Sequence, residues 1–342
     1  MKKIFLIVFA LIALYGCGGG DKKTEKKGSG ADESSYEQVE TSPDDKFSLQ
    51  YKMDKGDKFS YSFTSISTKN ETLTIDTTIS ITVRQKITYE IDIEVMAKKD
   101  TITNLRAVIK SAAVELNEND KKLTYKTGKK LNPMEKQFFM NYEAIVNSPF
   151  NMELSPTGLV LKVTGLNKAV DKMLTENNLQ DSVTAEQKKM IEEDLTQNAI
   201  MPMTQHLFRL IPSQPVALNE PWYFSFPSNL VMFQINNKAA FKVIGKEKLD
   251  DDDIAKIDAS LSMTWTGKTD FDDQGIKYHF SKPEVTGSGI IRYNLSKGLV
   301  QNSKTTTQFK LKAEMTSTLP QDKDKTANKV TTFTTENSIT LL

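Results

Sequence analysis

Two histidines, His206 and His279, are the only imidazole side chains among the 342 residues. A Ser-His-Asp arrangement needs one of them beside an activated nucleophile, and the sequence has no Gly-x-Ser-x-Gly element to supply one. Zinc takes several His or Cys ligands, and the chain has two histidines and one cysteine. We interpret both histidines as ordinary polar positions and expect no catalytic residue, no metal site and no cofactor. A cleft uniting either histidine with acidic residues would instead favour an enzyme.

Two acidic segments have the residue types that calcium prefers. The first is Asp250-Asp251-Asp252-Asp253, and the second, 270–275, has aspartates at its first and third positions and glycine sixth, as in an EF-hand loop. Gln274 replaces a third acidic or Asn ligand, and Ser281 stands where the bidentate glutamate belongs. Both segments also lie where a hairpin needs a polar turn. We interpret them as solvated turns, and the sequence leaves calcium binding open.

A third group of residues is suited to holding an apolar ligand. Methionine and aromatic side chains gather on segments with helical spacing in the middle of the chain, and a curved sheet capped by helices is a plausible site for a hydrophobic molecule. The same side chains would equally fill a packed core. The candidate lining residues are Phe138, Phe139, Tyr142, Met203 and Phe208.

Strands must position most of these residues. Apolar residues alternate with polar ones at period two before the middle of the chain and again from Trp222 to Ile339, and short polar turns separate the runs. Strands joined by short turns pair antiparallel. The order of strands, helices and strands predicts an α+β fold: a large, curved, mostly antiparallel sheet, half-barrel-like, with two or three helices inserted mid-chain and packed on one face.

The longest alternation, residues 73–95, has two interpretations. A single strand of that length would span about 75 Å at 3.3 Å per residue, so it either curls strongly or folds back at Arg84-Gln85-Lys86. The sequence does not decide. In the next strand the apolar parity slips between Ile109 and Val114, as a β-bulge would produce, and bulges bend sheets.

The helical insertion is predicted at about 132–212. Asn132, Pro133 and Glu135 have the types expected at N-cap, N1 and N3 of a helix, and Thr184 with Gln187 predicts a second capping box. Between them, Ser155-Pro156-Thr157-Gly158 predicts the turn of a hairpin. Pro202 should break or restart the last helix.

The first seventeen residues have the form of an export signal. A basic start is followed by an apolar run, residues 4–14, which is too short to span about 30 Å of hydrocarbon. Its ending, Leu14-Tyr15-Gly16-Cys17, resembles the lipobox of bacterial lipoproteins. The resemblance implies that a diacylglyceryl group is attached to Cys17 and that residues 1–16 are cut away. Gly18, rather than Asp, implies the outer membrane if the host has one.

The remainder divides into a tether and a domain. Residues 17–45 are rich in Gly, Ser, Lys, Asp and Glu, with Tyr36 and Val39 as the only large apolar residues, so we expect a disordered tether. Residues 46–342 form a single β-rich domain in this interpretation. Cys17 is the only cysteine, so no disulfide supports the fold. Removing residues 1–16 leaves a net charge of about −1, which excludes a strongly basic nucleic-acid surface.

Two motifs resemble a family of bacterial lipoproteins known only as a domain of unknown function. They are the hairpin segment 155–165, Ser-Pro-Thr-Gly-Leu-Val-Leu-Lys-Val-Thr-Gly, and the segment from Ile211 to Trp222. In that family a Gly-acidic pair commonly precedes the Trp, and here Asn219-Glu220-Pro221 takes its place. The resemblance covers most of the chain after the tether and implies no activity. The pattern of sheet and helices also looks like the half-barrel of periplasmic lipoprotein and lipid carriers, as an analogy of fold alone.

Together these features predict a non-catalytic protein of the cell envelope. It is exported, anchored to a membrane by lipidated Cys17, and binds an apolar ligand or partner segment between the curved sheet and the helices. An alternative is a surface or scaffold module with a filled core that recognises an envelope protein or a glycan. An enzyme is the third hypothesis.

Overall fold

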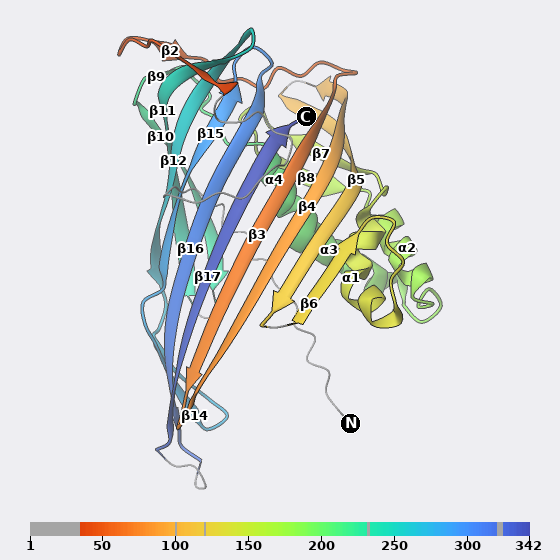
Figure 1. The fold of residues 1–342 in the computed structure, drawn as a ribbon, viewed down its shortest axis with the longest axis vertical. Helices are drawn as coiled ribbons and strands as arrows, with labels where there is room; N and C mark the ends of the chain where they lie inside the picture. The colour runs from red at the N-terminus through yellow and green to blue at the C-terminus, as the bar shows by residue number, and fades with distance from the viewer. Residues whose placement is uncertain (1–34, 100, 120, 231–232, 320–323) are drawn as a thin grey trace.

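A computed structural model describes residues 35–342 except 100, 120, 231–232 and 320–323. The signal, Cys17 and most of the predicted tether therefore lie outside the described residues. Strands precede and follow a helical middle (Figure 1). The first strands are β1 (Glu37–Val39), β2 (Lys46–Phe47), β3 (Lys58–Thr74), β4 (Thr78–Lys99), β5 (Ile102–Glu118) and β6 (Lys121–Lys126).

The middle contains the helices and one hairpin. In order they are α1 (Pro133–Ile145), β7 (Phe150–Leu154), β8 (Val160–Thr164), α2 (Asn167–Glu176), α3 (Ala185–Leu195), the π-helical turn η2 (Thr196–Ile200) and α4 (Met201–Leu207). Because η2 joins α3 directly to α4, the helices form three segments. In the described residues, none of these helices has the length and apolar character that a membrane crossing requires.

The second set of strands completes the sheet. They are β9 (Val216–Ala217), β10 (Pro221–Leu230), β11 (Phe233–Leu249), β12 (Asp252–Thr266), β13 (Asp270–Asp273), β14 (Ile276–Phe280), β15 (Glu284–Asn294), β16 (Leu299–Ser317) and β17 (Thr326–Leu341). Fifteen strands share one sheet, in the main order β1-β11-β12-β15-β16-β17-β3-β4-β5-β7-β8, while β2 and β9 form a separate pair. All the ladders between these strands are antiparallel, and the sheet does not close.

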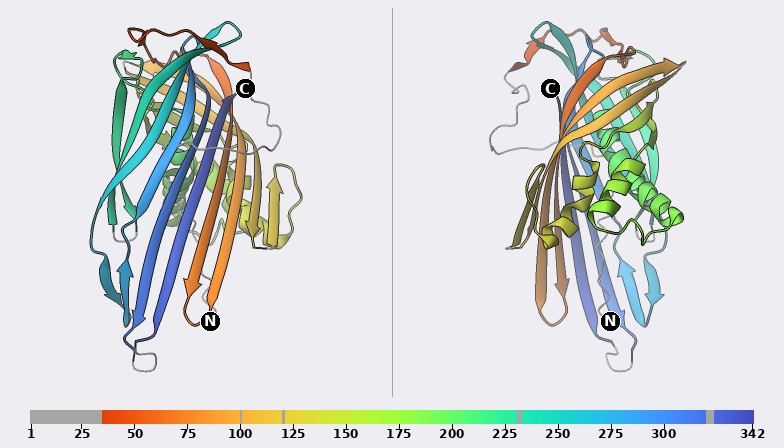
Figure 2. Two further views of the ribbon diagram at one scale, coloured as in Figure 1. Left: turned by 60° about the vertical axis from the view of Figure 1, so that its left-hand side comes forward. Right: turned by 90° about the vertical axis from the view of Figure 1, so that its right-hand side faces the viewer.

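The predicted fold class is confirmed. The sheet curves around the helices, which pack on its concave face (Figure 2). Alternation along the strands directs Phe63, Ile91, Leu105 and Met152 to this face, where they join Phe208 and other helical residues in one core cluster. A second cluster, which includes Trp222, Phe241 and Tyr293, lies on the β11, β12, β15 and β16 side.

A polar strip on the concave face separates the two clusters. Ser303, Thr305, Thr307 and Asn337 are each at most 4% exposed. Arg209 donates from Nη2 to the Ser303 hydroxyl at 2.7 Å, so the end of α4 is bonded to the middle of the sheet.

Both interpretations of residues 73–95 are wrong, since the segment is neither one strand throughout nor folded back at residues 84–86. The chain folds back at residues 75–77, β4 then runs without interruption from Thr78 to Lys99, and Leu73 pairs with Ile79. A three-residue loop keeps the apolar parity on both sides, which is why the alternation itself could not locate the turn. Asp76, in the middle of this loop, is of a residue type that favours turns.

The other local predictions are confirmed. Asn132 and Thr184 each form a capping box, with Glu135 and Gln187 respectively. The bulge falls at Lys110, because Glu90 pairs with Ser111 and Ile91 pairs with Ile109. The Pro202 segment begins α4 immediately after η2, so the proline alters the helix without ending it.

The described chain begins in contact with the body rather than as a free tether. Residues 37–39 form β1, which pairs with 246–248 of β11, and the Tyr36 ring lies over the Arg292 guanidinium at 4.2 Å. Gln38 donates to Glu247 at 2.6 Å. Tyr36, which we noted as an isolated apolar residue, is 7% exposed, and its burial attaches this end of the predicted tether to the sheet.

Candidate functional site

The five residues predicted to line a ligand site do not lie together on an open surface. Phe139, Met203 and Phe208 are 2%, 5% and 0% exposed and belong to the core between helices and sheet. Phe138 is 55% exposed on the outer side of α1. Tyr142 is half-buried, and its hydroxyl accepts a hydrogen bond from Gln85 at 3.0 Å. Burial raises the pKa of Tyr142 to about 12. The side chains from the helices therefore pack the fold.

The two histidines have unlike surroundings. His206 is buried against the Phe63 ring, and Asn337 lies 3.5 Å from its Nε2 atom. Burial, with a smaller contribution from the nearby Arg209 charge, lowers the pKa of His206 to about 3, so the ring is neutral at ordinary pH. His279 is exposed and lies 2.7 Å from Asp270. The hydrogen bond to Asp270 raises the pKa of His279, but the pair lies on the surface of the β13–β14 hairpin.

The acidic segments lie at turns between strands, as predicted. Asp250 and Asp251 connect β11 to β12, while Asp252 and Asp253 pair with Lys297 and Lys246, each at 2.9 Å. Gln274 and Gly275 make the β13–β14 turn with positive φ angles of 48° and 79°. Throughout the described ranges, three or more His, Cys, Asp or Glu residues do not gather into a group that would hold a metal ion.

Figure 2 shows that the helices do not reach the far half of the long strands. An apolar surface extends from the core along that half. The register identifies its residues. Phe63 pairs with Tyr89 and Ile339 on the concave face, and neither ladder shifts between there and the hairpin end. Every second residue therefore stays on that face. The apolar members are Leu73, Ile79, Ile81, Val83 and Phe333, and we call this surface the distal face.

The isoleucines of the distal face are unusually exposed for residues that continue a hydrophobic core. Ile79 is 58% and Ile81 40% exposed, and Ile75 at the turn is 53% exposed. Scattered surface apolar residues need no explanation, but a contiguous group is typical of an interaction site. From Ser67 to Leu73 the partly exposed concave-face side of β3 is about 20 Å long at 3.3 Å per residue.

Three charged side chains lie within the distal face. Lys69 forms an ion pair with Glu71 at 2.5 Å, and Lys329 pairs with the same carboxylate. Lys69 lies between Val83 and Phe333 across the ladders, and Lys329 lies beside Leu73. Partial burial would raise the pKa of Glu71, but hydrogen bonds from Lys329 and Lys69 outweigh it and lower that pKa. The sequence does not reveal this cluster, because Lys329 is far along the chain from Lys69 and Glu71 and meets them only through the pairing of β17 with β3.

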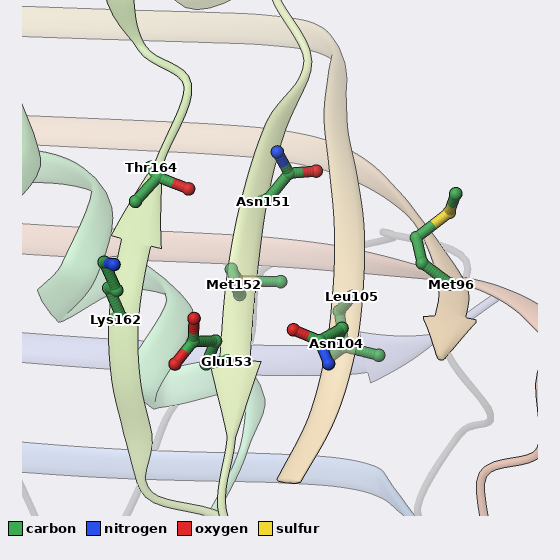
Figure 3. A pocket seen from close by; sticks show the side chains of 8 residues that line it. All are labelled: Met96, Asn104, Leu105, Asn151, Met152, Glu153, Lys162 and Thr164. Carbon is green, nitrogen blue, oxygen red and sulfur yellow. The ribbon is translucent and has the colours of Figure 1, made fainter. Parts of the chain in front are cut away.

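A pocket of about 250 Å³ lies elsewhere, on the opposite face of the sheet at β5, β7 and β8 (Figure 3). Its polar side chains are Asn104, Asn151, Glu153, Lys162 and Thr164, and Met96 lies at one side. Leu105 and Met152 contribute only from behind, since their side chains belong to the core. Glu153 and Lys162 are directly paired across β7 and β8, so the charges of the pocket oppose each other.

Comparison with known proteins identifies the class and then the family. The fold defines an open antiparallel β-sheet protein with helices inserted on its concave face. Residues 100–300 match the model of a family of unknown function, DUF6263, and the chain belongs to this family. This confirms the expectation of a domain-of-unknown-function family. No curated protein matches the chain.

Several solved structures have a distant likeness. The COG4313 outer membrane channel from Pseudomonas putida F1 is 8% identical, with 89% of this chain and 100% of that chain covered and a TM-score of 0.18. A DUF1329 family protein from Desulfovibrio piger is 7% identical over 79% and 83%, with a TM-score of 0.12. Pseudomonas aeruginosa OpdK with vanillate is 6% identical over 81% and 98%, with a TM-score of 0.15. Scores this low carry no argument about fold or function.

Proposed function

We propose that this protein is a non-catalytic lipoprotein of the cell envelope that holds an apolar ligand on its distal face. One observation carries the binding proposal: Ile79 and Ile81 continue the concave face of the core and yet are 58% and 40% exposed. Exposed apolar surface gains free energy when a ligand removes it from water, at about 25 cal/mol per Å². In this proposal the ligand lies beyond the helices rather than beneath them.

The charge and burial of the histidines support a binding role over an enzymatic one. His206 is buried and neutral, and the exposed His279 has Asp270 as its partner outside a cleft. Phe139, Met203 and Phe208 occupy the space under the helices. This supports the filled core that the scaffold hypothesis assumes. The distal face remains as the surface on which an apolar partner would be bound.

The binding proposal predicts that an uncharged hydrophobic dye, Nile red, is taken up by the folded full-length chain carrying Cys17→Ser. A double substitution, Ile79→Thr with Ile81→Thr, should reduce dye fluorescence at least several-fold, because it removes apolar area and keeps β-branched residues in the strand. The matched control is Ile244→Thr with Leu161→Thr, two residues that are 37% and 45% exposed outside the distal face. Equal losses in both double variants, or none in either, would exclude the distal face as the binding site.

The anchor is tested separately. Cells producing the wild-type chain and grown with a palmitate analogue should label the protein and retain it in the membrane fraction, because attached acyl chains partition into the bilayer at about 0.8 kcal/mol per CH₂. Cys17→Ser should abolish the label and release the protein. A wild-type chain that is unlabelled and free in solution would refute lipid attachment at Cys17.

A further inference from the structure

The charges within the distal face indicate which kind of apolar ligand it accepts. Two ammonium groups, of Lys69 and Lys329, share the single Glu71 carboxylate. The other concave-face positions of β3, β4 and β17 at this end are uncharged, and on β5 Glu118 lies directly opposite Lys121 of β6. A net positive charge therefore remains beside the apolar residues of the distal face.

The two lysines remain partly accessible. Their side chains are 35% and 42% exposed, against 21% for Glu71. Each ammonium has three donors, so donors remain for an added acid group after the bond to Glu71. The lysine stems add to the apolar surface, because their methylene groups pack while the ammonium groups stay in water.

We propose that the distal face binds a single-chain anionic amphiphile, with its acid group at Lys69 and Lys329 and its acyl chain along Ile79, Ile81 and Val83. This inference rests on the proposed function and adds the charge of the ligand to it. Ladder pairing places Val83 opposite Lys69 and Ile81 opposite Glu71, so the row from Val83 to Ile79, about 13 Å long at 3.3 Å per residue, would contact the part of an acyl chain next to its acid group. The charge of this surface suits a fatty acid.

The test compares an acid with the alcohol of the same chain. Oleate and oleyl alcohol are added to the full-length chain carrying Cys17→Ser, and binding is followed by displacement of Nile red and by native mass spectrometry. We expect oleate to bind about tenfold more tightly than the alcohol, since hydrogen bonds to charged groups are the stronger ones and partial exposure weakens them. Added salt should reduce the difference.

Variants of the three charged residues should act in opposite directions. Lys69→Gln with Lys329→Gln should weaken oleate binding about tenfold and leave oleyl alcohol unchanged. Glu71→Gln should tighten oleate binding about threefold, because it removes the carboxylate that competes for the same ammonium groups. The matched control, Lys304→Gln with Lys312→Gln, changes two exposed lysines on the other face of neighbouring β16.

The outcomes separate this inference from the proposed function. Equal binding of oleate and oleyl alcohol, or an equal loss in the control variant, would overturn the anionic ligand and leave an apolar ligand standing. Binding of neither compound and no uptake of the dye would overturn both. A dimer that dissociates in Ile79→Thr with Ile81→Thr, without bound oleate, would assign the distal face to a second copy of the chain and also overturn the proposal.

Discussion

Phe208→Ala is expected to lower the free energy of unfolding by about 3–5 kcal/mol. Phe208 is 0% exposed and packs edge-on against the Tyr51 ring, with the ring centroids 5.9 Å apart. Removing the ring takes away its burial and leaves a cavity between the end of α4 and the sheet, which the surrounding side chains refill only in part. Urea unfolding followed by circular dichroism measures the loss.

Phe138→Ala is the control for this prediction. Phe138 is 55% exposed, and a substitution at such a surface position changes the free energy of unfolding by about 0.5 kcal/mol or less. If the two alanine variants were equally stable, the assignment of Phe208 to the packed core would be wrong.

Arg292→Leu is expected to lower the free energy of unfolding by about 3 kcal/mol near neutral pH, because it removes one partner of a buried ion pair. The Glu247 side chain is 0% exposed and accepts from Arg292 at 2.6 Å, while Lys256 lies 2.9 Å from its other oxygen. The lysine remains in the variant, so the carboxylate keeps one cation. Thermal or urea unfolding at several pH values measures both the loss and its pH dependence.

The pH dependence has a definite direction. In the wild type, burial would raise the pKa of Glu247, but hydrogen bonds from Arg292, Lys256 and Gln38 hold it below its usual value. The ionised carboxylate then stabilises the fold above the unfolded-state pKa of about 4.3, and this contribution is lost as the pH falls through the lower folded-state value.

Without Arg292, burial should dominate and raise the pKa of Glu247. The loss of unfolding free energy in Arg292→Leu should therefore shrink as the pH is lowered from neutral. The exposed pair Lys58–Glu94, with side chains 72% and 39% exposed, provides the control. Lys58→Ala should cost less than about 1 kcal/mol. A deficit for Arg292→Leu that is constant with pH would contradict the assigned role of Glu247.

Much of the fold could be predicted because its signals are local. Each of these signals involves only a few neighbouring residues: the capping residues Asn132 and Thr184, the turn at Gly158 and the parity slip at Lys110. The turn at residues 75–77 could not be found in this way, since the alternation keeps the same parity through it. The pairing of β17 with β3 joins segments about 260 residues apart, and no local pattern specifies such a pairing.

The sequence could name candidate apolar residues but could not show which of them are covered in the fold. Aromatic residues such as Phe139 and Phe208 have the same spacing whether they line a cavity or fill a core, so the sequence could not choose between them. Packing decides that question, and here it buries them. Conversely, the alternation predicts that Ile79 and Ile81 face the core, because the sequence does not show where the covering helices end.

If Cys17 carries the proposed lipid, the attachment of β1 to β11 sets the end of the sheet from which the chain leads to the anchor. β1 lies at the end of the sheet where β3 begins, and the distal face lies at the other end, near Thr74. The 17 residues between Cys17 and Ser35 reach at most about 60 Å when fully extended, close to the length of β3, about 56 Å. In the proposed function, a lipid-anchored molecule with its tether extended would therefore hold its ligand on the side remote from the bilayer, an orientation suited to transfer across an aqueous gap.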